Sequence, residues 1–229
     1  MPIYWVRRTD VRPGLDGRWD GPAWREAEAL RVEHFHPASS DHRPLTLAKL
    51  LYDDAHLYGM FRVRDRYVVC RHPGYQAPVY KDSCVEFFVK PKPDKGYLNF
   101  ELNCGGGLLL YYISNWARKQ DPEDPNDEFE AFTKIPEEVG SRVAIYGSLP
   151  AVVDPEIRDE VEWLVEFHIP GSLLETYVGP LGKLAGQEWR ANFNKCADES
   201  SHPHWASWSP IGAELNLHQP DKFGVLRFE

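Results

Sequence analysis

Short apolar segments separated by turn residues make up most of this chain. Leu45–Tyr52 and Leu57–Val63 are separated by the four polar or small residues 53–56. Val85–Val89 and Tyr97–Asn103 flank a loop that contains both Pro and Gly. Strand-length apolar runs joined by short turn-like spacers are typical of β-hairpins. The pattern therefore predicts two hairpins in the first half of the chain.

The same pattern predicts further strands and very little helix. The additional strands are Leu108–Ile113, Val143–Gly147, Val161–Ile169, Trp189–Lys195 and Val225–Phe228. Helical signals are limited to Gly21–Val32, which is rich in Ala and Glu, and to about one turn at Ser172–Tyr177. Many short strands with few helices favour an all-β fold over repeated β-α-β units. We predict an antiparallel β-sandwich, jelly-roll or immunoglobulin-like, with one or two short helices.

The length and organisation of the chain favour a single domain. All-β domains of roughly 200–250 residues are common, and this chain has 229 residues, of which 42% are hydrophobic. No repeat of 20–50 residues is visible. The acidic, Pro-rich stretch Gln120–Glu130 is predicted to be a mobile surface loop. We therefore predict one domain over residues 1–229.

Charge and hydropathy exclude some classes of partner. The formal net charge of −9 argues against nucleic acid and anionic lipid surfaces, which require basic protein faces. No apolar run approaches the ~20 residues of a membrane-spanning helix. The first residues lack the pattern of a signal peptide, so the predicted location is cytoplasmic, or secreted or periplasmic if a leader was removed. The oligomeric state is left open.

The four cysteines give no motif. Cys70, Cys84, Cys104 and Cys196 are scattered without C-x-x-C spacing, and two of them lie in apolar strand-like segments. This distribution favours buried free thiols over disulfides or a zinc site.

The long connection before the last predicted strand carries the most unusual residues. Between Lys195 and Phe223 it holds Trp205, Trp208 and three histidines. Exposed apolar area costs about 25 cal/mol per Å², so loops normally avoid tryptophan. These rings therefore either close one end of the core or form a platform for a ligand.

Sugar binding requires flat aromatic faces together with carboxylate, amide or guanidinium groups for the hydroxyls. The candidate faces are Tyr80, Trp116, Trp205, Trp208 and His218, and the candidate polar partners are Glu86, Glu101, Asn103, Asn192, Asn194 and Arg190. Core packing is the alternative for each ring. Trp5, Trp19, Trp24, Trp163 and Trp189 lie in regular elements and are predicted to be core residues.

Three blocks of sequence share their order and spacing with one known family. They are LDGRWDGPAWREAEAL from residue 15, VYKDSCVEFFVKP with GYLNFELNCGG up to residue 106, and VEWLVEFHIPGSLL with EWRANFNKC and NLHQPDKFGVLRF near the end. Together they resemble carbohydrate-binding module family 9 and its single-domain relatives over nearly the whole chain.

The resemblance implies a non-catalytic β-sandwich that binds plant-type or microbial polysaccharides or oligosaccharides, often as an accessory to glycoside hydrolases, with structural calcium. In that family two tryptophans enclose a terminal sugar. The first position corresponds to Tyr80 and the second lies near Leu217 or His218. Glu86 corresponds to the polar partner on the central strand, and Glu101 replaces a family arginine. The predicted carbohydrate-binding residues are Tyr80, Glu86, Glu101, Asn103, Trp205, Trp208 and His218.

Two other functions remain open on the same residues. Glu86 and Glu101 could act as the acid and nucleophile of a glycoside-active enzyme, which requires carboxyl groups roughly 5–5.5 Å apart on one face. A protein-interaction module would instead expose the tryptophans of the long connection as a contiguous patch.

Metal sites are predicted only weakly by the sequence. Asp53, Asp54 and Asp82 lie near turns and are the candidate ligands for calcium, although turn capping is their usual role and no EF-hand pattern occurs. His202, His204 and His218 could form a three-histidine zinc site, with backbone capping in a polar loop as the alternative.

Overall fold

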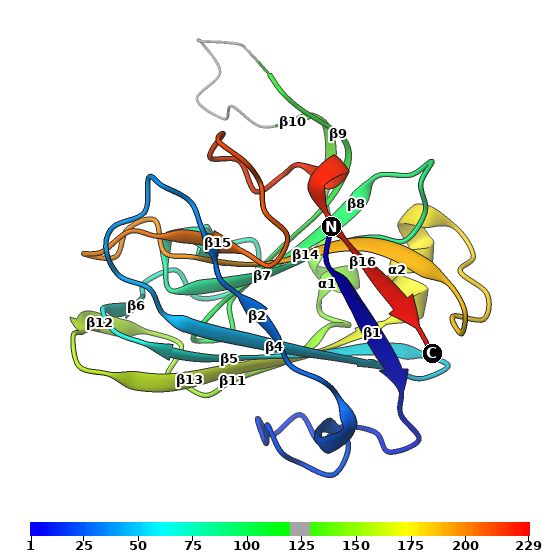
Figure 1. Ribbon diagram of the computed structural model, residues 1–229, viewed down its shortest axis with the longest axis horizontal. Coiled ribbons are helices and arrows are strands. Elements are labelled where there is room, and N and C mark those ends of the chain that lie inside the picture. Colours follow the sequence, from blue (N-terminus) through cyan, green and yellow to red (C-terminus); the bar gives the residue numbers. More distant parts are fainter. Residues whose placement is uncertain (120–128) are drawn as a thin grey trace.

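A computed structural model describes residues 1–119 and 129–229, and its ribbon is mostly β-structure curled into two layers (Figure 1). The first layer contains, in spatial order, β10 (Phe129–Lys134), β9 (Leu108–Arg118), β8 (Tyr97–Asn103), β7 (Cys84–Lys90), β14 (Glu188–Cys196) and β16 (Gly224–Phe228). The second layer contains β4 (Leu45–Tyr52), β5 (His56–Asp65), β13 (Val161–Pro170) and β11 (Ala144–Gly147). Most of the predicted acidic loop 120–130 lies outside the described residues.

Strand β1 (Ile3–Arg8) joins the two layers. Its residues Ile3–Val6 pair with β16 and its last two residues pair with β4, and both pairings are parallel. The neighbouring pairs on either side are antiparallel. The sheet is therefore mixed, and the prediction of a wholly antiparallel sheet is wrong at β1. Sequence alternation does not distinguish parallel from antiparallel partners for a single strand.

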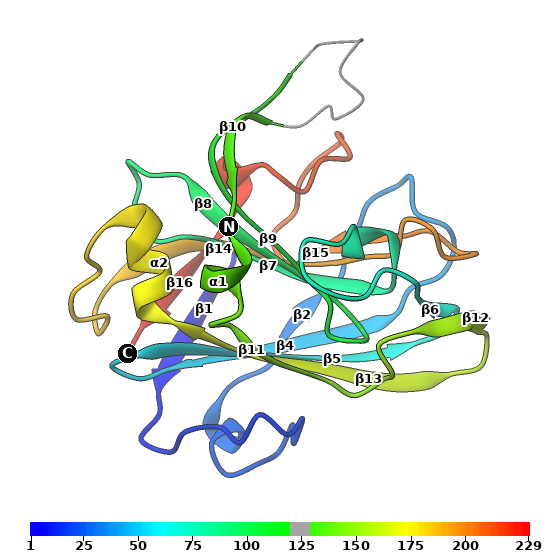
Figure 2. The ribbon, with the colours of Figure 1, turned by 180° about the vertical axis from the view of Figure 1, so that it is seen from behind.

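Shorter elements complete the fold. The short strands are β2 (Leu30–Val32) on β4, β3 (His34–Phe35) on β15 (Trp205–Ser207), and the separate pair β6 (Val68–Cys70) and β12 (Val153–Ile157). The α-helices are α1 (Glu137–Gly140) and α2 (Gly171–Val178), seen best from behind (Figure 2), and 3₁₀ turns occupy Trp24–Glu26, Val79–Lys81 and Pro220–Lys222. Neither α-helix of the described residues is long and apolar enough to cross a membrane.

Both predicted hairpins are confirmed. β4 pairs with β5 and β7 pairs with β8, each in antiparallel register. Because side chains alternate along a strand, Val85, Phe87 and Val89 of β7 enter the core between the layers, while Glu86 faces away from it. The ring of Phe87 lies 5.8 Å from the ring of Phe167 on β13, so the two layers meet through stacked aromatic side chains.

The helix predicted at Gly21–Val32 is wrong. The segment contains one 3₁₀ turn, followed by β2. Leu30 and Val32 are buried while Arg31 is exposed, a period of two that fits pairing with β4 better than a helix. Ala and Glu favour helix only weakly, and tertiary pairing overrides such a preference. The predicted helical turn at Ser172–Tyr177 is confirmed as α2.

Four of the five predicted core tryptophans are buried: Trp19, Trp24, Trp163 and Trp189. The prediction is wrong for Trp5, which is 51% exposed. Its neighbours Tyr4 and Val6 are buried, so alternation along β1 places Trp5 outside, where the Arg227 guanidinium lies 5.4 Å from its ring. The four cysteines are free and buried, as predicted.

Gly59 on β5 is required by close packing between neighbouring strands. A Cβ added at this position would lie 2.0 Å from Cζ of Phe167, a core ring that cannot move without disturbing both layers. We expect Gly59→Ala to lower the free energy of unfolding by about 1–3 kcal/mol in urea denaturation. Gly171→Ala is the control, because its Cβ would come no closer than 3.3 Å to Ala55. Equal losses in the two variants would contradict this account.

Candidate functional site

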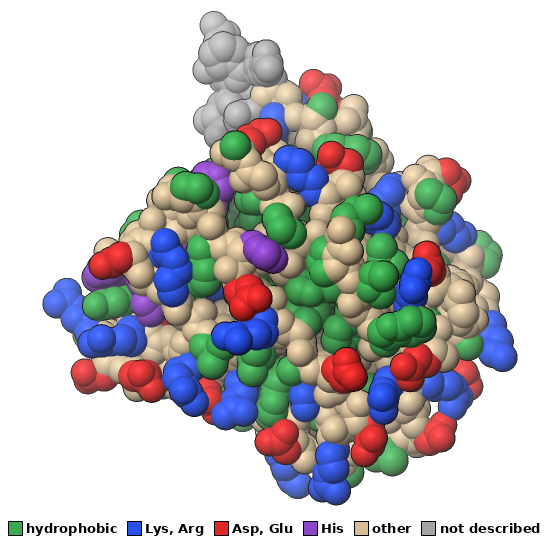
Figure 3. Space-filling view, in the orientation of Figure 1, with side chains coloured by type: hydrophobic (Ala, Val, Ile, Leu, Met, Phe, Trp, Pro, Cys, Tyr) green, Lys and Arg blue, Asp and Glu red, His purple; other side chains and the backbone are tan. Residues whose placement is uncertain are grey.

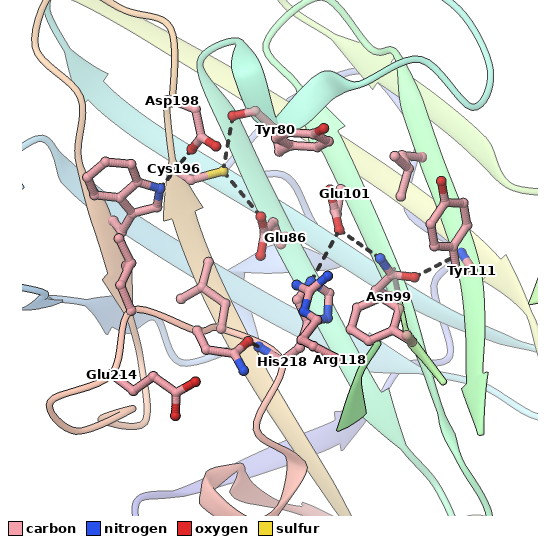
Figure 4. A pocket seen from close by; sticks show the side chains of 16 residues that line it. Tyr80, Glu86, Asn99, Glu101, Tyr111, Arg118, Cys196, Asp198, Glu214 and His218 are labelled. Carbon is pink, nitrogen blue, oxygen red and sulfur yellow. Dashed lines mark hydrogen bonds and ion pairs between the residues drawn. The ribbon is translucent and has the colours of Figure 1, made fainter. Parts of the chain in front are cut away.

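The outward face of the first layer forms the floor of a cavity of about 700 Å³ (Figure 4). The strands β7, β8 and β9 supply the floor, and the connection between β14 and β16 supplies one wall. The lining residues are Tyr80, Glu86, Asn99, Glu101, Leu109, Tyr111, Arg118, Phe129, Cys196, Asp198, Trp205, Glu214, Leu215, Asn216, Leu217 and His218.

Two glutamates lie side by side on the floor. Glu86 on β7 is the direct register partner of Glu101 on β8. Directly opposite residues of an antiparallel pair have Cβ atoms about 4.5–5.5 Å apart and point to the same face. Both residues are more than nine-tenths buried. The alternation that places Phe87 and Phe100 in the core therefore presents this pair to the cavity.

Amides and a thiol orient the two carboxyl groups. Asn194 donates to Glu86 Oε2 at 3.0 Å, and the Cys196 thiol donates to Glu86 Oε1 at 3.2 Å. Asn99 donates to Glu101 Oε1 at 2.7 Å and accepts a hydrogen bond from the backbone of Tyr111. The floor is thus a fixed polar surface, and its orientation does not depend on a ligand.

Burial raises the pKa of both glutamates. The pKa of Glu86 rises to about 7, with burial as the main cause. The pKa of Glu101 rises well above its usual value because of burial and then because of the neighbouring Glu86. Near neutral pH the pair therefore retains at least one proton, so it can both donate to and accept from a ligand hydroxyl group.

Aromatic side chains form the walls. Tyr80, from the 3₁₀ turn before β7, is 37% exposed, and Trp205 at the start of β15 is partly buried. The indole N–H of Trp205 donates to Asp198 at 2.7 Å, and the backbone of Asp198 donates to the carbonyl of Tyr80. These contacts fix two ring systems and a carboxyl group beside the glutamate pair.

The imidazole ring of His218 lines the cavity and is uncharged near neutral pH. Burial, and then the charge of Arg118, lowers the pKa of His218 to about 3. The Tyr97 hydroxyl group and Nδ1 share a hydrogen bond of 2.8 Å, and the imidazole ring stacks on Phe88 at 4.6 Å between centroids. The other ring nitrogen, Nε2, lies 4.0 Å from Glu101 Oε1.

The structure brings five of the seven predicted binding residues to this cavity: Tyr80, Glu86, Glu101, Trp205 and His218. Asn103 is fully buried and is bound to Asp82, to the His72 carbonyl and to the Gly107 amide, which orders the neighbouring loop. Trp208 is a core residue whose ring packs edge-on against Phe193. For Trp208 the core-packing alternative is correct, because the chain just after β15 stays bonded to Phe193 of β14 and turns this side chain inward.

Sequence reasoning missed other lining residues. Asn99 and Tyr111 could have been found, because Asn99 is two residues from Glu101 on the same strand face and Tyr111 is the register partner of Asn99. Asp198 and Glu214 lie in the irregular connection, where no periodicity predicts direction.

The residues predicted to hold calcium do not form one site. Asp53 accepts from Tyr58 and from two backbone amides of the β4–β5 turn, whereas Asp82 accepts from the amides of Arg71 and His72. Asp54 is exposed and pairs with Arg8. These contacts are those of turn-capping carboxylates, so the three residues do not fit a calcium site. Calcium binding stays a prediction.

The three histidines predicted for zinc do not form one site either, although His202 and His204 both lie beside His42. His204 bonds to Lys195, His202 stacks on Tyr67, and His218 belongs to the cavity. Over residues 1–119 and 129–229, the one metal-compatible group of His, Cys, Asp or Glu is Cys84, Glu86 and Cys196, with ligand atoms within 4.8 Å of each other. Burial raises the pKa of Cys84 to about 12, which keeps its thiol protonated and opposes metal binding.

A concave, aromatic-walled cavity over a fixed polar floor on a curled β-sheet defines a binding module for a small polar ligand. The model of carbohydrate-binding family 9 matches residues 26–228. The chain therefore belongs to carbohydrate-binding family 9. This confirms the family expected from the sequence blocks.

Solved structures share the fold of this chain. A putative carbohydrate-binding protein from Bacteroides uniformis is 26% identical, with 99% of each chain covered and a TM-score of 0.82. A family 9 module from Caldicellulosiruptor kristjanssonii in complex with cellotriose is 18% identical, covers 100% of this chain and 94% of its own, and has a TM-score of 0.64. The glucose complex of a family 9 module from the same organism is also 18% identical, with coverages of 100% and 96% and a TM-score of 0.63. No curated protein sequence matches the chain.

Proposed function

We propose that this chain binds carbohydrate without catalysis and that the cavity over Glu86 and Glu101 is its ligand site. The observation that carries the proposal is the placement of Tyr80 and Trp205 beside the paired carboxyl groups in one cavity of about 700 Å³. Aromatic rings pack against the C–H faces of a pyranose, and the carboxyl and amide groups bind its hydroxyls. The volume falls in the range of small-molecule sites.

Family membership and the named complexes support a sugar as the ligand. The two complexes from Caldicellulosiruptor kristjanssonii contain cellotriose and glucose, so a glucose-type sugar is the first to test here. A plant-type or microbial polysaccharide as the natural ligand, and an accessory role beside a glycoside hydrolase, are part of the same proposal. The two layers facing a common core support a β-sandwich and a single domain.

The enzyme alternative meets one of its two geometric conditions, because Glu86 and Glu101 are direct register partners on one face of the sheet. Family membership favours binding over catalysis. A retaining glycosidase requires one ionised nucleophile beside one protonated acid. The raised pKa values of the two carboxyl groups are compatible with that state as well, so an assay for released sugar decides between the two functions.

The protein-interaction alternative has less support. It requires the tryptophans of the long connection to form an exposed patch without a concave pocket. Trp208 is buried, and Trp205 lies on the wall of the cavity. On the face seen in Figure 3, acidic and basic side chains are interspersed.

We expect the double substitution Tyr80→Ala with Trp205→Ala to weaken sugar affinity at least about fivefold for each lost ring, because each stacked face contributes about 1 kcal/mol or more. The measurement is isothermal calorimetry with glucose and cello-oligosaccharides, each with calcium and with chelator. Trp116→Ala is the matched control, since Trp116 has the same 37% exposure as Tyr80 and does not line the cavity.

Two results would contradict the proposal. Unchanged affinity in the double variant, in a protein that binds sugar, would place the ligand site elsewhere. Release of reducing sugar in the same samples, abolished by Glu86→Gln, would show the enzyme instead. Loss of binding in chelator would establish the calcium requirement.

A further inference from the structure

The lining of the cavity has an unbalanced charge. Four of its residues are acidic, namely Glu86, Glu101, Asp198 and Glu214, and Arg118 is the one lysine or arginine among the described lining residues. The Arg118 guanidinium lies 4.2 Å from the Phe129 ring centroid. His218 is neutral, as described above. Glu86 and Glu101 lie next to each other in the close-up, with Asp198 beyond Cys196 and Glu214 farther away (Figure 4), whereas acidic and basic groups are interspersed on the outer surface seen in Figure 3.

The buried lysine next to this site faces the other way. Lys195 is adjacent in sequence to Asn194, but alternation along β14 turns it toward the space between the layers. Its ammonium lies 3.5 Å from Asp65 on β5 and 2.8 Å from His204. The protein therefore supplies no direct counter-ion to the glutamate pair from this strand.

One oxygen of the pair is left for a ligand. The hydrogen bond from Asn99 falls on Oε1 of Glu101, and Oε2 takes none among the described residues. Glu101 is nevertheless 4% exposed and lines the cavity. A second carboxyl group, Glu86, stands directly opposite. Two buried carboxyl groups in contact repel each other when ionised, and a cation between them removes both the repulsion and part of the burial cost.

The aromatic walls also suit a positive charge. Faces of Trp and Tyr attract an ammonium group, and the attraction grows as water is excluded. Trp205 is held by Asp198, so one wall offers both a ring and a further carboxyl group. An ammonium has three N–H donors and no acceptor, which matches carboxylate oxygens converging from different strands.

We propose that the cavity selects sugars that carry a free amino group, with the ligand's ammonium held between Glu86 and Glu101. The inference rests on the proposed function, because it names the ligand class of the same site. It distinguishes amino sugars such as glucosamine from neutral sugars of the same shape.

The experiment compares three ligands that differ at one substituent: glucosamine, glucose and N-acetylglucosamine. Calorimetry at pH 7 is expected to show glucosamine binding at least about tenfold tighter than glucose, in line with charge-assisted hydrogen bonds. N-acetylglucosamine, which has no charge, is expected to show no such advantage. The preference is expected to fall severalfold at 0.5 M salt.

Two further measurements connect the preference to the glutamates. Glu101→Gln keeps the shape of the side chain and is expected to reduce the ratio of glucosamine to glucose affinity to about twofold or less. Glu199→Gln is the matched control, because Glu199 pairs with Lys81 outside the cavity.

In the unmodified protein the ratio of glucosamine affinity to glucose affinity should also fall from pH 7 to pH 5, as Glu86 and Glu101 take up protons. The titratable and charged groups beside the pair on its own face of the sheet are Tyr80, Cys84, Tyr97, Arg118, Cys196, Asp198 and His218, and the charge of Lys195 acts on Glu86 from the opposite face of β14.

The outcomes separate the two proposals. Glucose affinity equal to or tighter than glucosamine affinity, with both bound, overturns the amino-sugar inference and leaves the sugar site intact. A glucosamine preference that survives Glu101→Gln and pH 5 also overturns it. No binding of any sugar by folded protein overturns the proposed function, and the inference with it.

Discussion

Asp65→Asn is expected to lower the free energy of unfolding by about 3–5 kcal/mol, because it leaves the buried ammonium of Lys195 without its counter-ion. Both residues are almost completely buried, and their charged atoms lie 3.5 Å apart. His42 contacts Oδ1 of Asp65 at 2.7 Å, and the Trp163 indole donates to Oδ2. Thermal unfolding at pH 7 should show a fall of roughly 10 °C in the midpoint.

The control is Asp54→Asn, which breaks an exposed ion pair with Arg8 and should change stability by no more than about 0.5 kcal/mol. Burial alone would raise the pKa of Asp65, but Lys195 and the His42 hydrogen bond outweigh it and lower the pKa to about 2. The lowered pKa stabilises the native state above pH 4, and this contribution is lost as pH falls toward 2. The difference between unmodified protein and Asp65→Asn should therefore shrink in acid. A constant difference from pH 7 to pH 2 would contradict the account.

Glu86→Gln is expected to stabilise the protein by about 2–3 kcal/mol at pH 8, while weakening ligand affinity. The pKa of Glu86 rises from 4.5 to about 7 through burial, so the native state favours its protonated form. A raised carboxyl pKa contributes stability that is complete below pH 4.5 and is lost as pH rises through 7. Each pKa unit corresponds to about 1.4 kcal/mol. Glutamine removes the ionisable proton and keeps a group of the same shape beside Asn194.

Urea denaturation of both proteins at pH 4 and pH 8 checks the prediction. The two stabilities should agree at pH 4 and diverge at pH 8. Glu199→Gln, at an exposed carboxylate paired with Lys81, should not show this divergence. Equal free energies of unfolding for Glu86→Gln and the unmodified protein at both pH values would contradict the prediction. They would mean that ionisation of Glu86 in the cavity does not destabilise the native state. The predicted gain in stability follows a general rule: binding sites keep side chains that the ligand requires even where these side chains lower the stability of the fold.

The strands were predictable because their burial alternates with a period of two. Val85, Phe87 and Val89 are core residues both by pattern and in the structure. The same alternation placed Glu86 and Glu101 on the opposite face, and the register made them neighbours. The parallel pairings of β1 were not predictable, because partner choice depends on the closure of the two layers and not on the strand's own residues.

The predictions for aromatic side chains were wrong at two tryptophans, for one common reason. Trp5 was predicted to be buried from its place in a regular element, yet strand alternation turns it outward. Trp208 was predicted to contact ligand from its place in a loop-like connection, yet it lies directly after β15 with its side chain in the core. Both errors come from assigning a ring by the type of its segment. Direction within the segment decides burial.

The split pairing of β1 also bears on the order of events during synthesis. β1 holds residues from the first ten of the chain against β16, which contains residues 224–228, and it also pairs with β4. The strand that connects the two layers is thus made early and must wait for a partner that is made more than 200 residues later. Contacts between such distant segments slow folding, since a large loop must close first. Until that closure, the open edges of β1 and β14 are the places where this chain is most exposed to incorrect pairing with other chains.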